Sequence, residues 1–148
     1  GSILLVRDSS FGLILTLSMF LSIWLCDTFA FVFGSSYGKT KLSPSISPNK
    51  TWLGAVFGFL ASFIVPLMVY KFFPINDNFM FIDYIVFGFI FGIFGQFGDL
   101  GVSLLKRQAQ IKDTSNILQG HGGILDRFDS LSFASPILFF FLYFRALL

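Results

Sequence analysis

The sequence predicts an all-α fold, a polytopic transmembrane bundle of about four membrane helices joined by polar cytoplasmic loops. Composition is the first reason. The 148 residues are 55% hydrophobic and only 12% charged, whereas a soluble domain carries about 25% charged residues. The second reason is that four apolar segments are each long enough to cross a bilayer, which takes about 20 residues. No internal repeat divides the chain, so we expect residues 1–148 to form a single membrane-embedded domain.

The four apolar segments follow one another with polar connections between them. Phenylalanine, with 23 copies, supplies much of their apolar mass. The first segment is interrupted by Asp27, and the third carries Gln96 and Asp99 toward its end. The expected crossings are residues 11–33, 53–70, 79–105 and 131–148.

Basic residues indicate the orientation of the bundle. Seven of the ten Lys and Arg residues lie in the first and third connections, residues 34–52 and 106–130. Four crossings place these two connections on one side of the membrane, and the positive-inside rule makes that side cytoplasmic. We therefore expect an integral membrane protein whose first and third connections face the cytoplasm.

Charge and cysteine content exclude several other classes of function. A net charge of +2 is too small to indicate a nucleic-acid partner. The single cysteine, Cys26, excludes an internal disulfide and a cysteine-based metal site. All eight acidic residues are aspartates, whose short carboxylates suit tight metal sites.

Two aspartates lie inside apolar segments, where an ionisable side chain is costly and by default functional. If the helix at Asp99 continues, Ser103, Lys106 and Arg107 follow at four, seven and eight residues and share its face. Snorkelling at a helix end explains the two cations as well, but it does not explain Asp99. Asp27 must face a polar interior or a partner, and either a binding role or pairing with a lysine would satisfy it.

The third connection contains the sequence GHGGILDRFD at residues 120–129. Its glycines permit close approach of the backbone to a ligand, and the apolar pattern resumes at Ile124, where we expect a helix to begin. A glycine-rich turn into a helix N-terminus is an anion site, because free N–H groups and the helix dipole point at the ligand.

Asp126 and Asp129 are three residues apart on one face of that helix and would repel each other without a cation. Mg²⁺ typically takes one or two carboxylates and completes its shell with water and substrate phosphates. The sequence thus indicates a Mg²⁺ site beside a phosphate, and a second cation is left open. His121 suits a general base, a phosphate donor or a packed loop residue, and nothing local chooses among these.

The first connection contains SISPNKTWLG at residues 45–54, which offers hydroxyl groups and one cation, Lys50. An ordinary basic cytoplasmic loop is an equal interpretation of this stretch taken alone.

Three stretches together point to a known family. They are CDTFAFVFG at 26–34, SPNKTWLG at 47–54 and SLLKRQAQIKDTSNILQGHGGILDRFD at 103–129. In order and spacing they resemble the motifs of the CDP-diacylglycerol synthases, also called phosphatidate cytidylyltransferases. Leu53 and Gln119 stand where that family usually has Glu and Pro. The resemblance covers the C-terminal catalytic half of the family, which normally has several more N-terminal helices.

The resemblance implies that CTP and phosphatidate give CDP-diacylglycerol and pyrophosphate, a step of phospholipid biosynthesis, without a covalent enzyme intermediate. It implies CTP, phosphatidate and the bilayer as partners, Mg²⁺ as cofactor, and a homodimer. The implied catalytic residues are Asp99, Lys106, Arg107, Lys112, Asp113, His121, Asp126 and Arg127. The implied substrate-binding residues are Ser47, Lys50, Thr51, Ser103, Gly122, Gly123 and Asp129. The implied metal ligands are Asp99, Asp126 and Asp27.

Three alternatives remain open from the residues. A CTP-dependent lipid kinase would transfer the γ-phosphate and release CDP instead of pyrophosphate. A cation channel or transporter would use Asp27 and Asp99 as an ion path and would not depend on CTP. An inactive, truncated paralogue would only assemble with partners.

Overall fold

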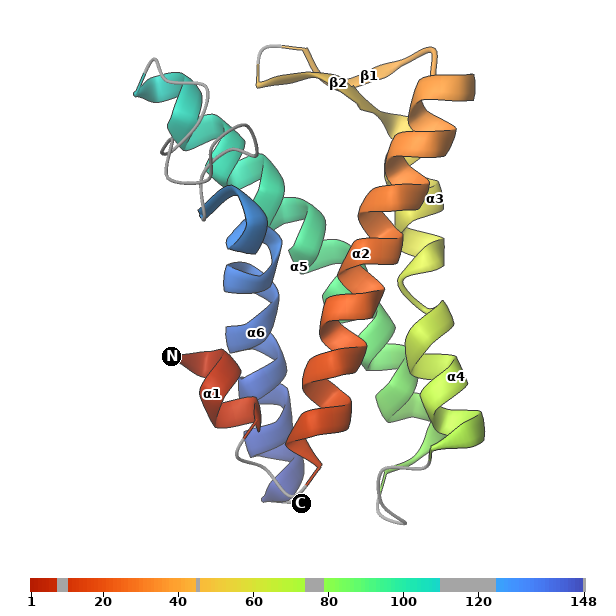
Figure 1. Cartoon of the computed structure of the whole chain (residues 1–148), viewed down its shortest axis with the longest axis vertical. Helices are drawn as coiled ribbons and strands as arrows, with labels where there is room; N and C mark the ends of the chain where they lie inside the picture. Colours follow the sequence, from red (N-terminus) through yellow and green to blue (C-terminus); the bar gives the residue numbers. More distant parts are fainter. Residues whose placement is uncertain (8–10, 45, 74–78, 110–124, 148) are drawn as a thin grey trace.

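The computed structural model describes residues 1–7, 11–44, 46–73, 79–109 and 125–147, with the backbone alone at 125–128. As predicted, this part of the chain is mostly helical, and its strands form a single two-stranded hairpin. Figure 1 shows the helices gathered into one bundle with the hairpin at one end. The elements are α1 (Ser2–Arg7), α2 (Gly12–Tyr37), β1 (Lys41–Ser43), β2 (Ser47–Thr51), α3 (Trp52–Ala61), α4 (Ile64–Phe72), α5 (Phe81–Gln108) and α6 (Leu125–Ala146).

Three of the four expected crossings are confirmed by helix length and composition. They are Gly12–Tyr37, Trp52–Phe72 and Phe81–Gln108, with 26, 21 and 28 residues. Helix α6 has 22 residues but is not among them. Its first turns carry Asp126, Arg127 and Asp129, so its apolar stretch begins only at Leu131.

The second crossing is not the continuous helix that the sequence predicted. Helix α3 ends at Ala61 and α4 begins at Ile64. Pro66 explains the interruption, because its ring clashes with the carbonyl of the residue four positions earlier, which is Ser62. The Ser62 hydroxyl lies 2.8 Å from the carbonyl oxygen of Gly88 in α5, so the interrupted turn is also bonded to its neighbour.

The first connection contains β1 and β2, the two strands in the described part of the chain. These strands pair as an antiparallel hairpin in which Lys41 lies opposite Thr51. Thr51 then begins α3, since its side-chain oxygen accepts a hydrogen bond from the Gly54 N–H at 3.2 Å. A threonine in this position caps the free N–H groups of a helix start. The cap therefore fixes where the hairpin meets α3.

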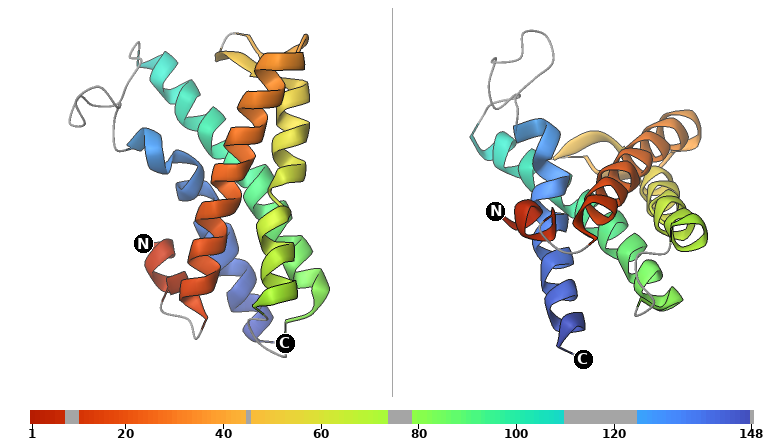
Figure 2. Two further views of the ribbon diagram at one scale, coloured as in Figure 1. Left: turned by 45° about the vertical axis from the view of Figure 1, so that its right-hand side comes forward. Right: turned by 60° about the horizontal axis from the view of Figure 1, so that its bottom comes forward.

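Close packing holds α5 at the centre of the bundle. It contacts α2, α3, α4 and α6, and Figure 2 shows α6 on one side of it and α3 and α4 on the other. Met19, Phe91 and Leu138, from α2, α5 and α6, are fully buried where these helices meet. Trp24 and Phe31 are instead more than 70% exposed. Such outward apolar side chains are expected where a helix faces lipid.

The two ends of the bundle are formed by different elements. The hairpin, the C-terminal end of α5 and the N-terminal end of α6 lie together, and the C-terminus lies at the opposite end (Figure 1). This confirms that the first connection and the described borders of the third lie at one end. At the other end Arg145 of α6 forms an ion pair with the buried Asp83 of α5, Nε to Oδ1 3.2 Å.

Candidate active site

A cavity of about 420 Å³ lies beneath the hairpin, between α2, α3 and α5. Glycines make it possible for these elements to approach closely. A Cβ added to Gly54 of α3 would lie 3.0 Å from the Cα of Gly34 in α2, and one added to Gly58 would lie 2.7 Å from the Cys26 carbonyl oxygen. The polar side chains that line the cavity are Asp27, Ser35, Lys41, Asn49, Lys50, Thr51, Gln96 and Asp99.

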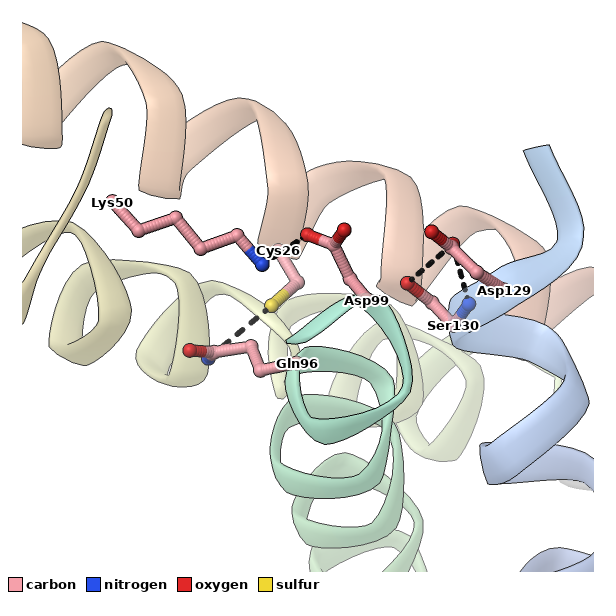
Figure 3. A network of polar contacts seen from close by, with 6 residues as sticks. All are labelled: Cys26, Lys50, Gln96, Asp99, Asp129 and Ser130. Carbon is pink, nitrogen blue, oxygen red and sulfur yellow. Dashed lines mark hydrogen bonds and ion pairs between the residues drawn. The ribbon is translucent and has the colours of Figure 1, made fainter. Parts of the chain in front are cut away.

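An ion pair crosses this cavity. The Lys50 ammonium on β2 contacts Oδ2 of Asp99 on α5, and the two side chains are 28% and 31% exposed. Figure 3 shows Lys50 reaching along the cavity to the Asp99 carboxylate. The structure thus joins two residues that are 49 positions apart in the sequence, each predicted separately as a site residue.

Asp27 faces the same cavity from α2, as the sequence required of an aspartate in an apolar segment. It forms no ion pair with any residue that the structure describes. Asp27, Asp99 and Asp129 lie close enough for their charges to interact. The cavity therefore holds carboxylates on two walls, and one of them is unpaired within the described part of the chain.

Gln96, one turn before Asp99 on α5, contacts the two helices that form the other walls of the cavity, α2 and α3. Its Nε2 donates to the carbonyl oxygen of Ala55 in α3 at 3.0 Å and lies 3.6 Å from Sγ of Cys26 in α2. One side chain on α5 therefore bonds to both neighbouring helices. The sequence showed Gln96 as a polar residue in an apolar helix, on the face of Asp99, but did not indicate this role.

Asp129 approaches Asp99 from the other side. Figure 3 shows its carboxylate beyond Asp99, away from Lys50. It is buried and accepts hydrogen bonds from the Ser130 N–H at 2.6 Å and the Ser130 hydroxyl at 3.2 Å. Burial raises the pKa of the Asp129 carboxyl, and the Asp99 carboxylate raises it further, while the Ser130 hydrogen bonds and Lys106 lower it.

The third crossing continues as one helix through Gln108, as the shared face of Asp99, Ser103 and Lys106 required. Ser103 and Lys106 are half-buried on it, and Lys106 interacts electrostatically with Asp129. Arg107 is exposed, and its Nε donates to the Ile46 carbonyl oxygen at 3.3 Å. Arg107 thereby bonds the end of α5 to the hairpin.

The remaining predicted residues divide into three groups. In the hairpin, Ser47 is half-buried in β2, whereas Thr51 is buried and its hydroxyl caps α3. Asp126 and Arg127 lie in α6, but their side chains are not described, and the predicted helix start at Ile124 lies outside the described residues. Five predicted residues lie outside the described residues: Lys112, Asp113, His121, Gly122 and Gly123.

The donor set of the cavity is compatible with Mg²⁺. Within the described ranges, no three His, Cys, Asp or Glu side chains form a ready-made cluster for a metal ion. Mg²⁺ does not need one, because it is usually held by one or two carboxylates, water and substrate phosphates. Asp27 and Asp99 on facing walls meet that requirement, and their role as metal ligands remains a prediction, as does that of Asp126.

The bundle and its cavity define a class of protein: an integral membrane protein with a charged site at one end of an apolar helical bundle. The chain belongs to the cytidylyltransferase family, which it matches over residues 1–145.

Curated relatives agree with this assignment. The chain is 46% identical over 138 residues to the phosphatidate cytidylyltransferase of Staphylococcus saprophyticus, covering 93% of this chain and 52% of that protein. It is 48% identical over 127 residues to the protein of that name from Staphylococcus haemolyticus, with 86% and 48% covered. For Staphylococcus aureus strain COL the identity is 46% over 140 residues, with 93% and 52% covered. The chain thus spans about half the length of the curated relatives it matches.

Proposed function

We propose that the chain catalyses cytidylyl transfer from CTP to phosphatidate, giving CDP-diacylglycerol and pyrophosphate in phospholipid biosynthesis. One observation carries the proposal: the Lys50–Asp99 pair sits in a cavity at the end of a membrane bundle. The name shared by relatives about 46% identical over most of this chain supports the same chemistry. A cavity at that level lets acyl chains stay in the bilayer while a water-soluble nucleotide enters from the end.

The reaction needs no covalent enzyme intermediate. A phosphatidate phosphate oxygen attacks the α-phosphorus of CTP, the bond from that phosphorus to the bridging oxygen breaks, and pyrophosphate leaves with the electron pair. The nucleophile is already an anion, so the protein must mainly position two polyanions and neutralise charge in the transition state.

The basic residues suit that task. Lys50 projects into the cavity, and Lys106 and Arg107 lie where α5 ends near the hairpin. Lysine presents a compact charge on a flexible stem, and arginine a planar fork for phosphate oxygens. We assign phosphate binding to all three, together with Lys112 and Arg127. The proposed hydroxyl and backbone contacts come from Ser47, Thr51, Ser103, Gly122 and Gly123.

Asp27, Asp99 and Asp126 are the proposed metal ligands. Bound Mg²⁺ would supply Lewis-acid stabilisation of the negative charge on the transferring and leaving phosphates. Asp99 is held for this role on the rigid α5 and Asp27 faces it from α2. Asp113, His121 and Asp129 complete the proposed polar site.

We also propose that the hairpin end faces the cytoplasm of a bacterial inner membrane, because CTP is supplied there and the basic connections lie at that end. A homodimer is a further part of the proposal.

The test is product analysis with purified protein in detergent, CTP, Mg²⁺ and phosphatidate. We expect pyrophosphate and CDP-diacylglycerol in equal amounts, dependent on phosphatidate. Asp99→Asn should lower the rate about 100-fold, since removing one preorganised electrostatic group commonly costs that much. The matched control is Lys71→Gln, which changes one charge on an exposed side chain of α4, far from the cavity.

The outcomes separate the alternatives. Release of CDP with phosphorylation of a lipid alcohol would establish the kinase instead. Ion flux in vesicles without any CTP-dependent product would favour the channel. Absence of any CTP-dependent product from the wild-type chain would count against the proposal.

A further inference from the structure

The charges of the cavity are arranged unevenly. Asp27 and Asp99 contribute carboxylates, while Lys41 and Lys50 contribute ammonium groups. Among the contacts of the described residues, Lys50 pairs with Asp99, and no ion pair joins Lys41 or Asp27 to a described partner. Lys50 therefore occupies the position at Asp99 that a cation would take.

The two partners of this pair differ in mobility. Asp99 has a short side chain on α5, and α5 is bonded to α3 by Gln96 close by. Lys50 has a flexible four-carbon stem, and its ammonium is free to rotate among acceptors. Both side chains are about 30% exposed, so water reaches the pair. Partly exposed ion pairs are weak, which makes exchange of the partner easy.

The pair is also not required to hold the hairpin in place. Thr51, the next residue, is fixed by its hydrogen bond with Gly54 at the start of α3. Just before β2, the carbonyl oxygen of Ile46 accepts a hydrogen bond from Arg107. The backbone around Lys50 is thus anchored on both sides, and its side chain can leave Asp99 without moving the hairpin.

We propose that Lys50 is an exchangeable counter-ion for Asp99: phosphate groups of the substrate draw the ammonium away and so free Asp99, beside Asp27, for a divalent cation. This inference rests on the proposed function, because it takes the phosphate-bearing ligand and the cation from there. It adds a linkage between them, in which binding of a phosphate group strengthens cation binding, and the reverse, by the same factor.

The physical argument is a competition between anions. A carboxylate offers Lys50 one negative charge, whereas a triphosphate offers several on neighbouring oxygens, so the ammonium favours the triphosphate once it arrives. Departure of Lys50 leaves the Asp27 and Asp99 carboxylates in the cavity without the ammonium that neutralised Asp99. The two carboxylates repel each other, and binding of a divalent cation is favoured because it cancels this repulsion.

The test measures Mn²⁺ binding without nucleotide, by electron paramagnetic resonance of the protein in detergent. We expect Lys50→Met to bind Mn²⁺ about tenfold more tightly than the wild type, within the usual range of coupling between sites. The double variant Lys50→Met/Asp99→Asn should lose that gain. Lys50→Arg, which can retain the pair, should bind no more tightly than the wild type.

Two controls separate pairing from general charge. Lys41→Met removes an ammonium from the same cavity that is not paired with a described carboxylate, and it should change Mn²⁺ affinity less than twofold. Sulfate, as a stand-in for a phosphate group, should raise Mn²⁺ affinity in the wild type but not in Lys50→Met. Chloride at equal ionic strength is the reference for sulfate.

The inference is overturned by equal Mn²⁺ affinity in Lys50→Met and wild type, by an equal gain in Lys41→Met, or by a gain that survives Asp99→Asn. Absence of Mn²⁺ binding in every variant also overturns it. Pyrophosphate release by the wild type decides the proposed function separately, so either idea can fail while the other stands.

Discussion

Gly98 of α5 lies directly against the backbone of Asp129 in α6. A Cβ added to Gly98 would be 2.8 Å from the Asp129 carbonyl oxygen and 3.0 Å from the Cα of Ser130. These neighbours are backbone atoms and cannot rotate away. The absence of a side chain at position 98 therefore determines how closely Asp129 approaches Asp99, the next residue on α5.

Gly98→Ala should consequently separate α5 from α6 at the candidate site. Overpacking of this kind costs about 1–3 kcal/mol, and a displacement of about 1 Å at a reacting centre can lower a rate 100-fold. We expect lower thermal stability in detergent and a large loss of pyrophosphate release. The matched control is Gly101→Ala, whose Cβ would be 3.5 Å from the Phe133 ring, an ordinary contact. Equal behaviour of the two variants would contradict the close approach.

Thr51 should act first through its cap on α3. Thr51→Val keeps the shape but removes the oxygen that accepts the Gly54 N–H, so we expect a loss of about 1 kcal/mol in stability. Thr51→Ser keeps the oxygen and should stay close to the wild type. Thermal unfolding tests the cap, and KM for CTP tests the proposed substrate contact. A Val variant as stable as the Ser variant would show that the cap contributes little.

Gln96 should determine how α5 sits against α3. Gln96→Leu removes the hydrogen bond to the Ala55 carbonyl, and one such bond contributes about 0.5–1.5 kcal/mol. Because Asp99 lies one turn further along α5, we expect kcat to fall more than KM rises. Cys26→Ala is the comparison, since it removes only the weak sulfur contact and keeps the bond to Ala55. A larger effect of Cys26→Ala on kcat would contradict the positioning role.

Arg145 should stabilise the bundle at the end opposite the cavity. Arg145→Met leaves the buried Asp83 carboxylate without its guanidinium. Breaking a fully buried pair costs about 3–5 kcal/mol. Because the Arg145 side chain is 28% exposed, we expect about 2 kcal/mol. Asp83→Asn in the same chain should recover part of this loss in thermal unfolding.

The control for Arg145→Met is Lys71→Met, an exposed basic residue of α4. Neither variant should alter KM for CTP, because both lie far from the cavity. A stability loss shared equally by both would mean that general charge, and not the pair with Asp83, is responsible.

Local sequence was sufficient for several features of the fold. Three of the four membrane helices that the apolar segments predicted are confirmed. The shared face of Asp99, Ser103 and Lys106 required only that α5 continue, which it does. These features depend on residues close in the chain, whose spacing already carries the helical period.

Other features escaped prediction because they depend on neighbours. The interruption after Ala61 follows from Pro66, but a bond from Ser62 to Gly88 of another helix helps to accommodate it. The hairpin of β1 and β2 is fixed where Thr51 caps α3. Pro66 is a local signal for the interruption that the prediction did not use, whereas the hairpin has no clear local pattern.

The sequence by itself determined that this is a membrane helical bundle and that it belongs with the cytidylyltransferases, and it supplied the polar residues that are predicted to form the site. Only the tertiary structure decided which of those residues meet: Lys50 with Asp99 across the cavity, and Asp129 beside Asp99 through Gly98. The reason is physical. Helical periodicity depends on residues that are close in the sequence. A contact between residues 49 positions apart depends instead on how the glycine-rich faces of the helices pack, and that packing is a property of the whole bundle.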